Sequence, residues 1–130
     1  AECRRILKDN GNILLVWNDR DTENELIREN YDINRRFCPN FKGPSNGIDF
    51  SKEAFADFFE GDFIFVEFGN DLIYDENAFV SRCLSSSYAP KTDKKNYNEY
   101  VAELQKLFKK YNQSGTVPYP YITRCYIGKV

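Results

Sequence analysis

Residues 12–21 read Asn-Ile-Leu-Leu-Val-Trp-Asn-Asp-Arg-Asp, and the apolar first half of this stretch decides the fold class. Residues 13–17 are five consecutive apolar residues without polar alternation. Such a run predicts a strand covered on both faces, as in a parallel or mixed sheet flanked by helices. It is too short to span a membrane. Asn10-Gly11 precedes it and is typical of a helix end, so the order helix, turn, strand predicts an α/β protein.

The chain becomes polar directly after this strand, at residues 18–21. In doubly wound α/β proteins, the loops at the carboxyl ends of strands hold the groups that bind substrate. We therefore expect Asn18 and Arg20 to be substrate-binding residues, with Arg20 able to bind a carboxylate or phosphate through two parallel hydrogen bonds. A structural role is the alternative, in which the two aspartates favour the start of the next helix while Arg20 pairs with Asp21 or Glu25.

The composition predicts one globular domain over residues 1–130, because 42% of residues are hydrophobic and 16% are aromatic. The net charge of −2 and the scattered basic residues do not favour nucleic acid as a partner. The chain has no signal peptide and no transmembrane run, so no membrane association is expected. It also has no histidine, which leaves any proton transfer to other side chains and no catalytic residue assigned.

The four cysteines lie tens of residues apart and form no paired motif. Without histidine they cannot complete a mixed zinc site, so no metal site is predicted. We expect reduced, mostly buried thiols in a cytoplasmic protein, with a disulfide framework as the alternative. The chain contains no methionine, and residues 1–3 begin inside a predicted helix that has no capping residue, so we expect a piece of a larger protein.

The rest of the chain alternates helices and strands. A capping box at residues 22–25 predicts a helix that ends at Cys38-Pro39, and a second helix should begin at Ser51, with Phe50 packed on Phe55, and end at Gly61. Residues 63–68 predict a strand that residues 72–74 continue. Helices should then follow Asp75 and the capping box of Asn96 with Glu99. Two prolines before Tyr121 restrict the last strand to residues 121–127.

Two further sets of residues are candidates for ligand contact. Tyr88, together with residues 85–87, could line a pocket through hydroxyl groups, although three serines before a proline also suit a fraying helix end. The aromatic residues within 119–126 and 55–68 could stack on a ligand, and core packing is the alternative.

Residues 2–21 resemble a segment of the class I S-adenosylmethionine-dependent methyltransferases, the segment that joins the helix after the fourth strand to the fifth strand. There a basic helix is followed by Leu-Lys-Pro-Gly-Gly and an apolar strand. Here Asp9-Asn10-Gly11 stands in place of Pro-Gly-Gly. Residues 79–90, which end in Ser-Ser-Ser-Tyr-Ala-Pro, and residues 119–129 resemble a bacterial, type 11-like branch of the same family.

The resemblance implies a sheet order of three, two, one, four, five, seven, six, with the seventh strand antiparallel. The present strands would be the fifth, sixth and seventh. We therefore expect an α/β chain with a partial Rossmann-like sheet of three strands, the last one antiparallel, and four to five helices. Such a chain would be the carboxyl-terminal, substrate-side half of the enzyme, acting on a small-molecule acceptor through Asn18, Arg20 and Tyr88.

The cofactor half of that family is not represented in this sequence. Class I methyltransferases hold S-adenosylmethionine with a glycine-rich loop after the first strand, and no G-x-G pattern occurs here. S-adenosylmethionine is therefore expected in the parent enzyme, and the chain alone should be inactive. The alternative is a small α+β binding or interaction module with no enzymatic role.

The same sheet order leaves residues 13–17 as an edge strand with apolar faces. Such an edge lacks the lysines, prolines and bulges that normally prevent association. We expect a homodimer formed through strand 13–17, because a two-fold contact closes on itself.

Overall fold

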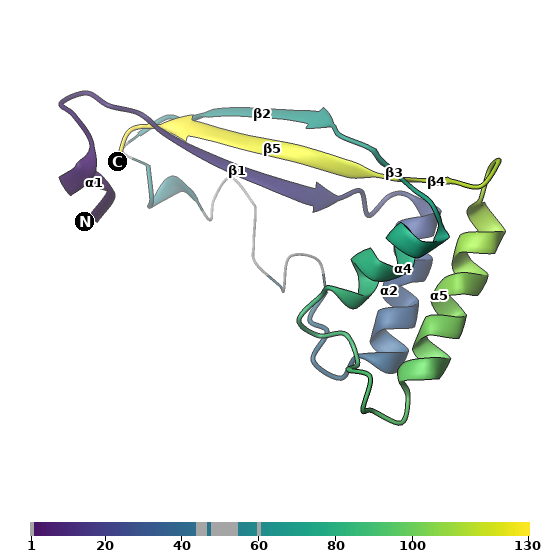
Figure 1. Cartoon of the computed structure of the whole chain (residues 1–130). Helices are drawn as coiled ribbons and strands as arrows, with labels where there is room; N and C mark the ends of the chain where they lie inside the picture. Colours follow the sequence, from purple (N-terminus) through teal and green to yellow (C-terminus); the bar gives the residue numbers. More distant parts are fainter. Residues whose placement is uncertain (1, 44–46, 48–54, 60) are drawn as a thin grey trace.

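The computed structural model describes residues 2–43, 47, 55–59 and 61–130 (Figure 1). An elongated sheet lies across one side, and three helices stand together beneath the end at which β1 finishes. In chain order the named elements are α1 (Glu2–Ile6), β1 (Ile13–Arg20), α2 (Glu25–Phe37), β2 (Ile64–Gly69), β3 (Leu72–Tyr74), α4 (Glu76–Leu84), α5 (Tyr97–Tyr111), β4 (Val117–Tyr119) and β5 (Tyr121–Gly128).

The main sheet has three strands in the order β1-β5-β2. Strand β5 is antiparallel to both neighbours, with Val16 opposite Cys125 and Cys125 opposite Val66. The predicted α/β class is confirmed. Every strand pair in the described part of the chain is antiparallel, so the structure does not confirm a Rossmann-like sheet.

A second, two-stranded sheet corrects two expectations about strand ends. Residues 72–74 do not continue β2 but form β3, which pairs with β4 and places Ile73 opposite Pro118. We expected the prolines to keep this part of the chain out of a central ladder and to restrict strand pairing to residues 121–127. An outer strand of a two-stranded sheet needs hydrogen bonds on one side only, so a proline whose nitrogen faces away is tolerated.

Helices α2, α4 and α5 surround the apolar core at this end of the sheet (Figure 1). The apolar spacing of α5 predicted its helix correctly, since its buried side chains lie on one face. No described helix has both the length and the apolar character needed to cross a membrane. The fully buried side chains of this core include Ile27, Phe79, Tyr100, Leu104, Val117 and Tyr119.

The helix starts follow their predicted caps only in part. Asp75 caps α4 as expected, with Oδ1 accepting from the Ala78 amide at 2.8 Å. The capping box at residues 22–25 is wrong, because Asn24 caps α2 by accepting from the Leu26 amide at 3.0 Å. The box at Asn96 is also wrong. Its side-chain amide instead donates to the Phe37 carbonyl at 2.8 Å, so a tertiary contact replaces the local one.

One face of the main sheet is covered and the other is open. Trp17 and Tyr126 pack against Phe55 on the covered face, with ring centroids 5.4 and 4.4 Å from it. The predicted helix start at Ser51 and the Phe50 contact lie outside the described residues. The prediction that residues 13–17 are covered on both faces is wrong within the described part of the chain, because β1 and β2 carry five apolar side chains that are 41–62% exposed. These are Leu14, Val16, Ile64, Val66 and Phe68.

Candidate functional site

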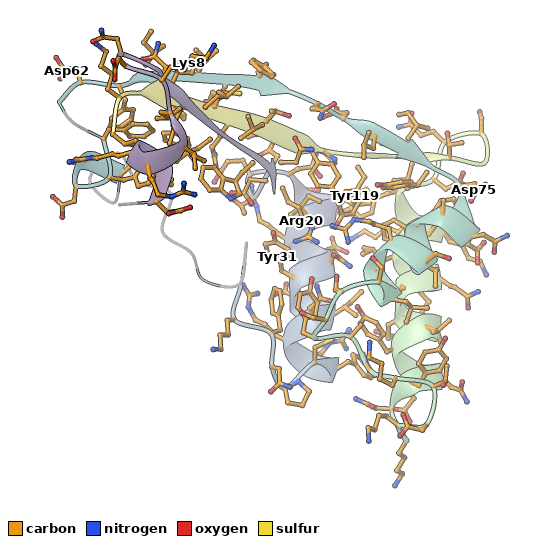
Figure 2. All side chains as sticks on the ribbon, turned by 60° about the vertical axis from the view of Figure 1, so that its left-hand side comes forward. Lys8, Arg20, Tyr31, Asp62, Asp75 and Tyr119 are labelled. Atoms are coloured by element: carbon orange, nitrogen blue, oxygen red, sulfur yellow. The ribbon has the colours of Figure 1, made fainter. Side chains whose placement is uncertain are left out.

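The candidate site lies where β1 ends against the helices. Arg20 is the last residue of β1, and its guanidinium carbon lies 5.9 Å from the centre of the Tyr31 ring on α2. Figure 2 shows Arg20 between Tyr31 and Tyr119. The carboxyl end of a strand is where the sequence predicted a substrate-binding arginine. The structure therefore places Arg20 in the protein interior next to aromatic rings, at the predicted end of the strand.

A second arginine approaches from α4. The Nε atom of Arg82 donates to the Tyr121 hydroxyl at 2.9 Å. Burial acts to lower the pKa of Arg82, but the Tyr121 hydroxyl raises it overall; the charge on Arg20 is a smaller effect that acts to lower it. Both guanidinium groups stay charged at any physiological pH. We call this group the arginine–tyrosine cluster, and it consists of Arg20, Arg82, Tyr31, Tyr88, Tyr119 and Tyr121.

The tyrosines supply hydroxyl groups and no negative charge. Burial raises the pKa of Tyr31, although Arg20 acts in the opposite direction. Burial also raises the pKa of Tyr119. Both side chains are therefore neutral hydroxyls near pH 7, and neither balances the two guanidinium charges.

The nearest acidic residue in the chain, Asp19, is paired with another arginine, although burial and, to a smaller extent, the charge of Asp19 both act to raise the pKa of Tyr31. Neighbouring side chains of a strand leave opposite faces, so Asp19 diverges from Arg20. The Oδ2 atom of Asp19 accepts from Arg124 Nη1 at 2.8 Å, and Arg124 also reaches Glu67 at 3.3 Å. No ion pair joins Arg20 to Asp21 or Glu25 among the described residues, so the structural role that we considered for Arg20 is not found.

Arg20 has unused hydrogen-bonding capacity. Its Nε atom and the Tyr31 hydroxyl are both buried, and neither makes a hydrogen bond of normal geometry with a described residue, although the two side chains lie close enough for a hydrogen-bonding interaction between them to affect the pKa of each. Buried polar atoms are hydrogen-bonded in the large majority of cases, so each exception needs a reason. Two such atoms from facing residues indicate a place for a third group.

A buried asparagine holds the walls of the site together. Asn30 Oδ1 accepts from the Tyr119 hydroxyl at 3.1 Å, and Asn30 Nδ2 donates to Cys83 Sγ at 3.6 Å. These two bonds connect α2 to β4 and to α4. The sequence pointed to Tyr119 only as one of several aromatic residues that could stack on a ligand, and it did not single out Asn30 or Arg82. The available signal was a polar residue at an apolar position of α2, since Asn30 shares its buried face with Leu26 and Ile27.

The structure separates the three predicted site residues. Tyr88 lies close enough to Arg20 to affect its pKa. Burial acts to lower the pKa of Arg20, but Tyr119, Tyr88 and Tyr31 together raise it. Tyr88 also contacts Phe41, whose ring lies 5.0 Å from it. Asn18 makes no described contact with the cluster. Its Oδ1 accepts from Thr123 Oγ1 at 2.6 Å on the exposed part of β1.

The serine and aromatic candidates have mainly structural contacts. Ser85 Oγ donates to the Arg82 carbonyl at 2.8 Å, which is the helix-end role that we considered. Ser87 and Tyr88 line a cavity of about 350 Å³ between the end of α2 and the segment after α4. Tyr119 and Tyr126 are 1% exposed, so they pack in the core, whereas Phe68 is 50% exposed on the open sheet face.

The thiols and acidic groups form no metal centre in the described part of the chain. All four cysteines are free, with Cys38 and Cys83 buried and Cys3 and Cys125 partly buried. No described group of three histidine, cysteine, aspartate or glutamate side chains could hold a metal ion. A scan against protein-family models, a search of curated proteins and a search of solved structures returned no match to this chain.

Proposed function

We propose that this chain is the acceptor-binding, carboxyl-terminal part of a bacterial, type 11-like class I S-adenosylmethionine-dependent methyltransferase that acts on a small molecule in the cytoplasm. The observation that carries this proposal is the strand order β1-β5-β2, with β5 antiparallel to both neighbours. Strands that follow each other in a chain usually lie side by side. Here the last strand separates the first two, as the family order five, seven, six requires.

The position of the arginine–tyrosine cluster also supports an acceptor site. It lies at the carboxyl end of β1, which corresponds to the fifth strand in this interpretation. Ligands of open α/β sheets bind beyond the carboxyl ends of the strands. In-line methyl transfer depends mainly on holding the acceptor at the right position, and the cluster can orient an acceptor through charge and hydroxyl donors.

The chain's own residues do not fit S-adenosylmethionine. The seven glycines are isolated from one another in sequence, and β1 is followed by Asp21-Thr22-Glu23 instead of a glycine-rich turn. No residue of this chain is therefore assigned a chemical step on the cofactor. In the proposed enzyme, a segment with a glycine-rich loop would hold S-adenosylmethionine, and the present residues would bind and orient the acceptor.

Titration calorimetry with S-adenosylmethionine tests this proposal on two proteins, the chain described here and the complete product of its natural gene. The complete product should bind the cofactor with a micromolar dissociation constant, whereas the chain alone should release no heat of binding. A complete product that does not bind S-adenosylmethionine would refute the proposal. Micromolar binding by the chain alone would refute the claim that a separate segment of the enzyme holds S-adenosylmethionine.

The open sheet face favours a second candidate, a non-enzymatic interaction module. Five large apolar side chains of β1 and β2 are exposed on one face of the sheet, with Ile127 and Cys125 of β5 between them, and apolar patches often mark interaction surfaces. In the described part of the chain, β1 pairs on one side only, so we also propose that it forms a homodimer through residues 13–17. A complete gene product that associates but does not bind S-adenosylmethionine would favour the module.

A further inference from the structure

We propose that the arginine–tyrosine cluster binds an oxyanion, namely the carboxylate or phosphate group of a small molecule. The identification of that molecule as a methyl acceptor rests on the proposed function. The binding itself requires neither S-adenosylmethionine nor methyl transfer. It can therefore be tested on the chain as it is.

The first argument is the charge of the cluster. The cluster holds two guanidinium groups, Arg20 beside the Tyr31 ring and Arg82 bonded to the Tyr121 hydroxyl, and no ion pair with a described carboxylate balances either of them. Their facing tyrosine hydroxyls are neutral partners. Burying a charge without an opposite charge is costly, whereas pairing it with a hydrogen-bonded anion offsets much of that cost. The cluster thus has an excess of positive charge that an anion would balance.

The second argument is the geometry of the donors. Arg20 Nε–H and the Tyr31 hydroxyl are both buried without a normal hydrogen bond, and the Tyr31 ring lies 5.9 Å from the Arg20 guanidinium carbon. One oxyanion can accept from both groups, because each of its oxygens has more than one lone pair. Arg20 and Arg82 are each only partly buried, so the cluster is not sealed from solvent.

The third argument is that the cluster is held in place without a ligand. Asn30 fixes Tyr119 and Cys83, and the Tyr121 hydroxyl fixes Arg82. Binding sites whose groups are already oriented lose less conformational entropy when the ligand binds. A direct contact between Arg20 and Tyr31, through the ring and through hydrogen bonding between the two side chains, is the purely structural explanation of this arrangement, and it predicts no anion binding.

The experiment is a titration of the ¹⁵N-labelled chain observed through its arginine Nε–Hε signals. Benzoate, phenyl phosphate and inorganic phosphate are the probes, benzyl alcohol is the neutral control, and the ionic strength is held constant. The Arg20 signal, assigned with Arg20→Lys, should shift and saturate with a dissociation constant on the order of 1 mM. Saturation with benzoate alone identifies a carboxylate site, saturation with the phosphates alone identifies a phosphate site, and both results support the proposal.

Matched variants connect binding to the cluster. Arg20→Lys should weaken the tightest probe about tenfold, since lysine lacks the planar pair of donors. Tyr31→Phe removes only a hydroxyl and should weaken binding several-fold while leaving the circular dichroism spectrum unchanged. The control is Arg36→Gln. Arg36 pairs with Glu103 at 2.7 Å on the exposed surface of α2 and α5, so this variant should bind like the wild type.

Two results would overturn the proposal. One is an Arg20 signal that shows no saturable shift with any anion up to about 50 mM. The other is binding that Arg20→Lys and Tyr31→Phe both leave unchanged. Cofactor titration of the complete gene product can fail while anion binding succeeds, and the reverse can also occur, so the two proposals are separable.

Discussion

The Tyr119→Phe variant tests whether the buried hydrogen bond to Asn30 stabilises the framework of the arginine–tyrosine cluster. The Tyr119 hydroxyl donates to Asn30 Oδ1 at 3.1 Å, and the two residues are 1% and 2% exposed. Phenylalanine fills the same space without the hydroxyl. The substitution therefore leaves the Asn30 carbonyl oxygen buried without its donor, and creates almost no cavity.

The expected cost follows from that unpaired oxygen. A buried acceptor that loses its only donor costs about 1–3 kcal/mol. For a chain of this size, each kcal/mol lowers the melting temperature by roughly 4 °C, so we expect a decrease of roughly 4–12 °C. This is a large share of the stability of an ordinary domain.

Urea denaturation followed by circular dichroism at 222 nm measures the effect. Tyr97→Phe is the control, because Tyr97 is only partly buried and its hydroxyl makes no hydrogen bond in the described part of the chain. A double-mutant cycle with Asn30→Ala adds specificity. The double variant should cost less than the sum of the single variants by about 1 kcal/mol. A Tyr119→Phe variant within about 0.5 kcal/mol of the wild type, or an additive cycle, would refute the reasoning.

Three further predictions concern other parts of the chain. Burial raises the pKa of Cys83 from 9.0 to about 11. Between these pH values the Cys83 thiol is deprotonated in the unfolded chain but still protonated in the folded chain. The free energy of unfolding should therefore fall as the pH rises through this range. Cys83→Ala should reduce this fall by about 1.4 kcal/mol per pH unit in urea titrations, and identical slopes would contradict the assignment. Gly128→Ala should destabilise the chain by about 1–3 kcal/mol, because the new Cβ would lie 2.6 Å from Phe59 Cδ1. Adding Phe59→Leu to Gly128→Ala should restore part of the lost stability. An unchanged denaturation midpoint in Gly128→Ala would refute the contact. Light scattering during gel filtration should give the wild-type chain a mass twice its chain mass of 15.3 kDa. Val16→Lys places a charge on the exposed face of β1 and should give a monomer. A monomeric wild type would exclude the dimer through β1.

The sequence was sufficient for the local features of this protein. The apolar run of residues 13–17 predicted β1, the 3.6-residue spacing of apolar residues predicted α5, and Asp75 was identified correctly as the cap of α4. Each of these features depends on residues within a turn or two of the chain. The class α/β follows from the succession of such elements.

The features that the sequence did not predict depend on partners from other elements. Asn96 has the right residue type for a helix cap, but the Phe37 carbonyl takes its amide hydrogen. Pro118 looks unsuited to a strand, but β3 provides a neighbour that does not need its missing N–H. The exposure of Val16 depends on what covers the sheet, and an unbroken apolar run carries no information about that.

The candidate site shows the same division. The position of Arg20 after an apolar strand was enough to select it from the sequence, because strand ends collect ligand-binding groups. Asn18 satisfied the same rule but lies apart from the cluster, where its Oδ1 accepts from Thr123 opposite it on β5, and its role in substrate binding stays a prediction. Arg82, Tyr31 and Tyr119 come from α4, α2 and β4, which meet only in the folded chain. Sequence determined which residue types were available, and packing between distant elements decided which two arginines share a partly buried site where no described carboxylate forms an ion pair with either of them.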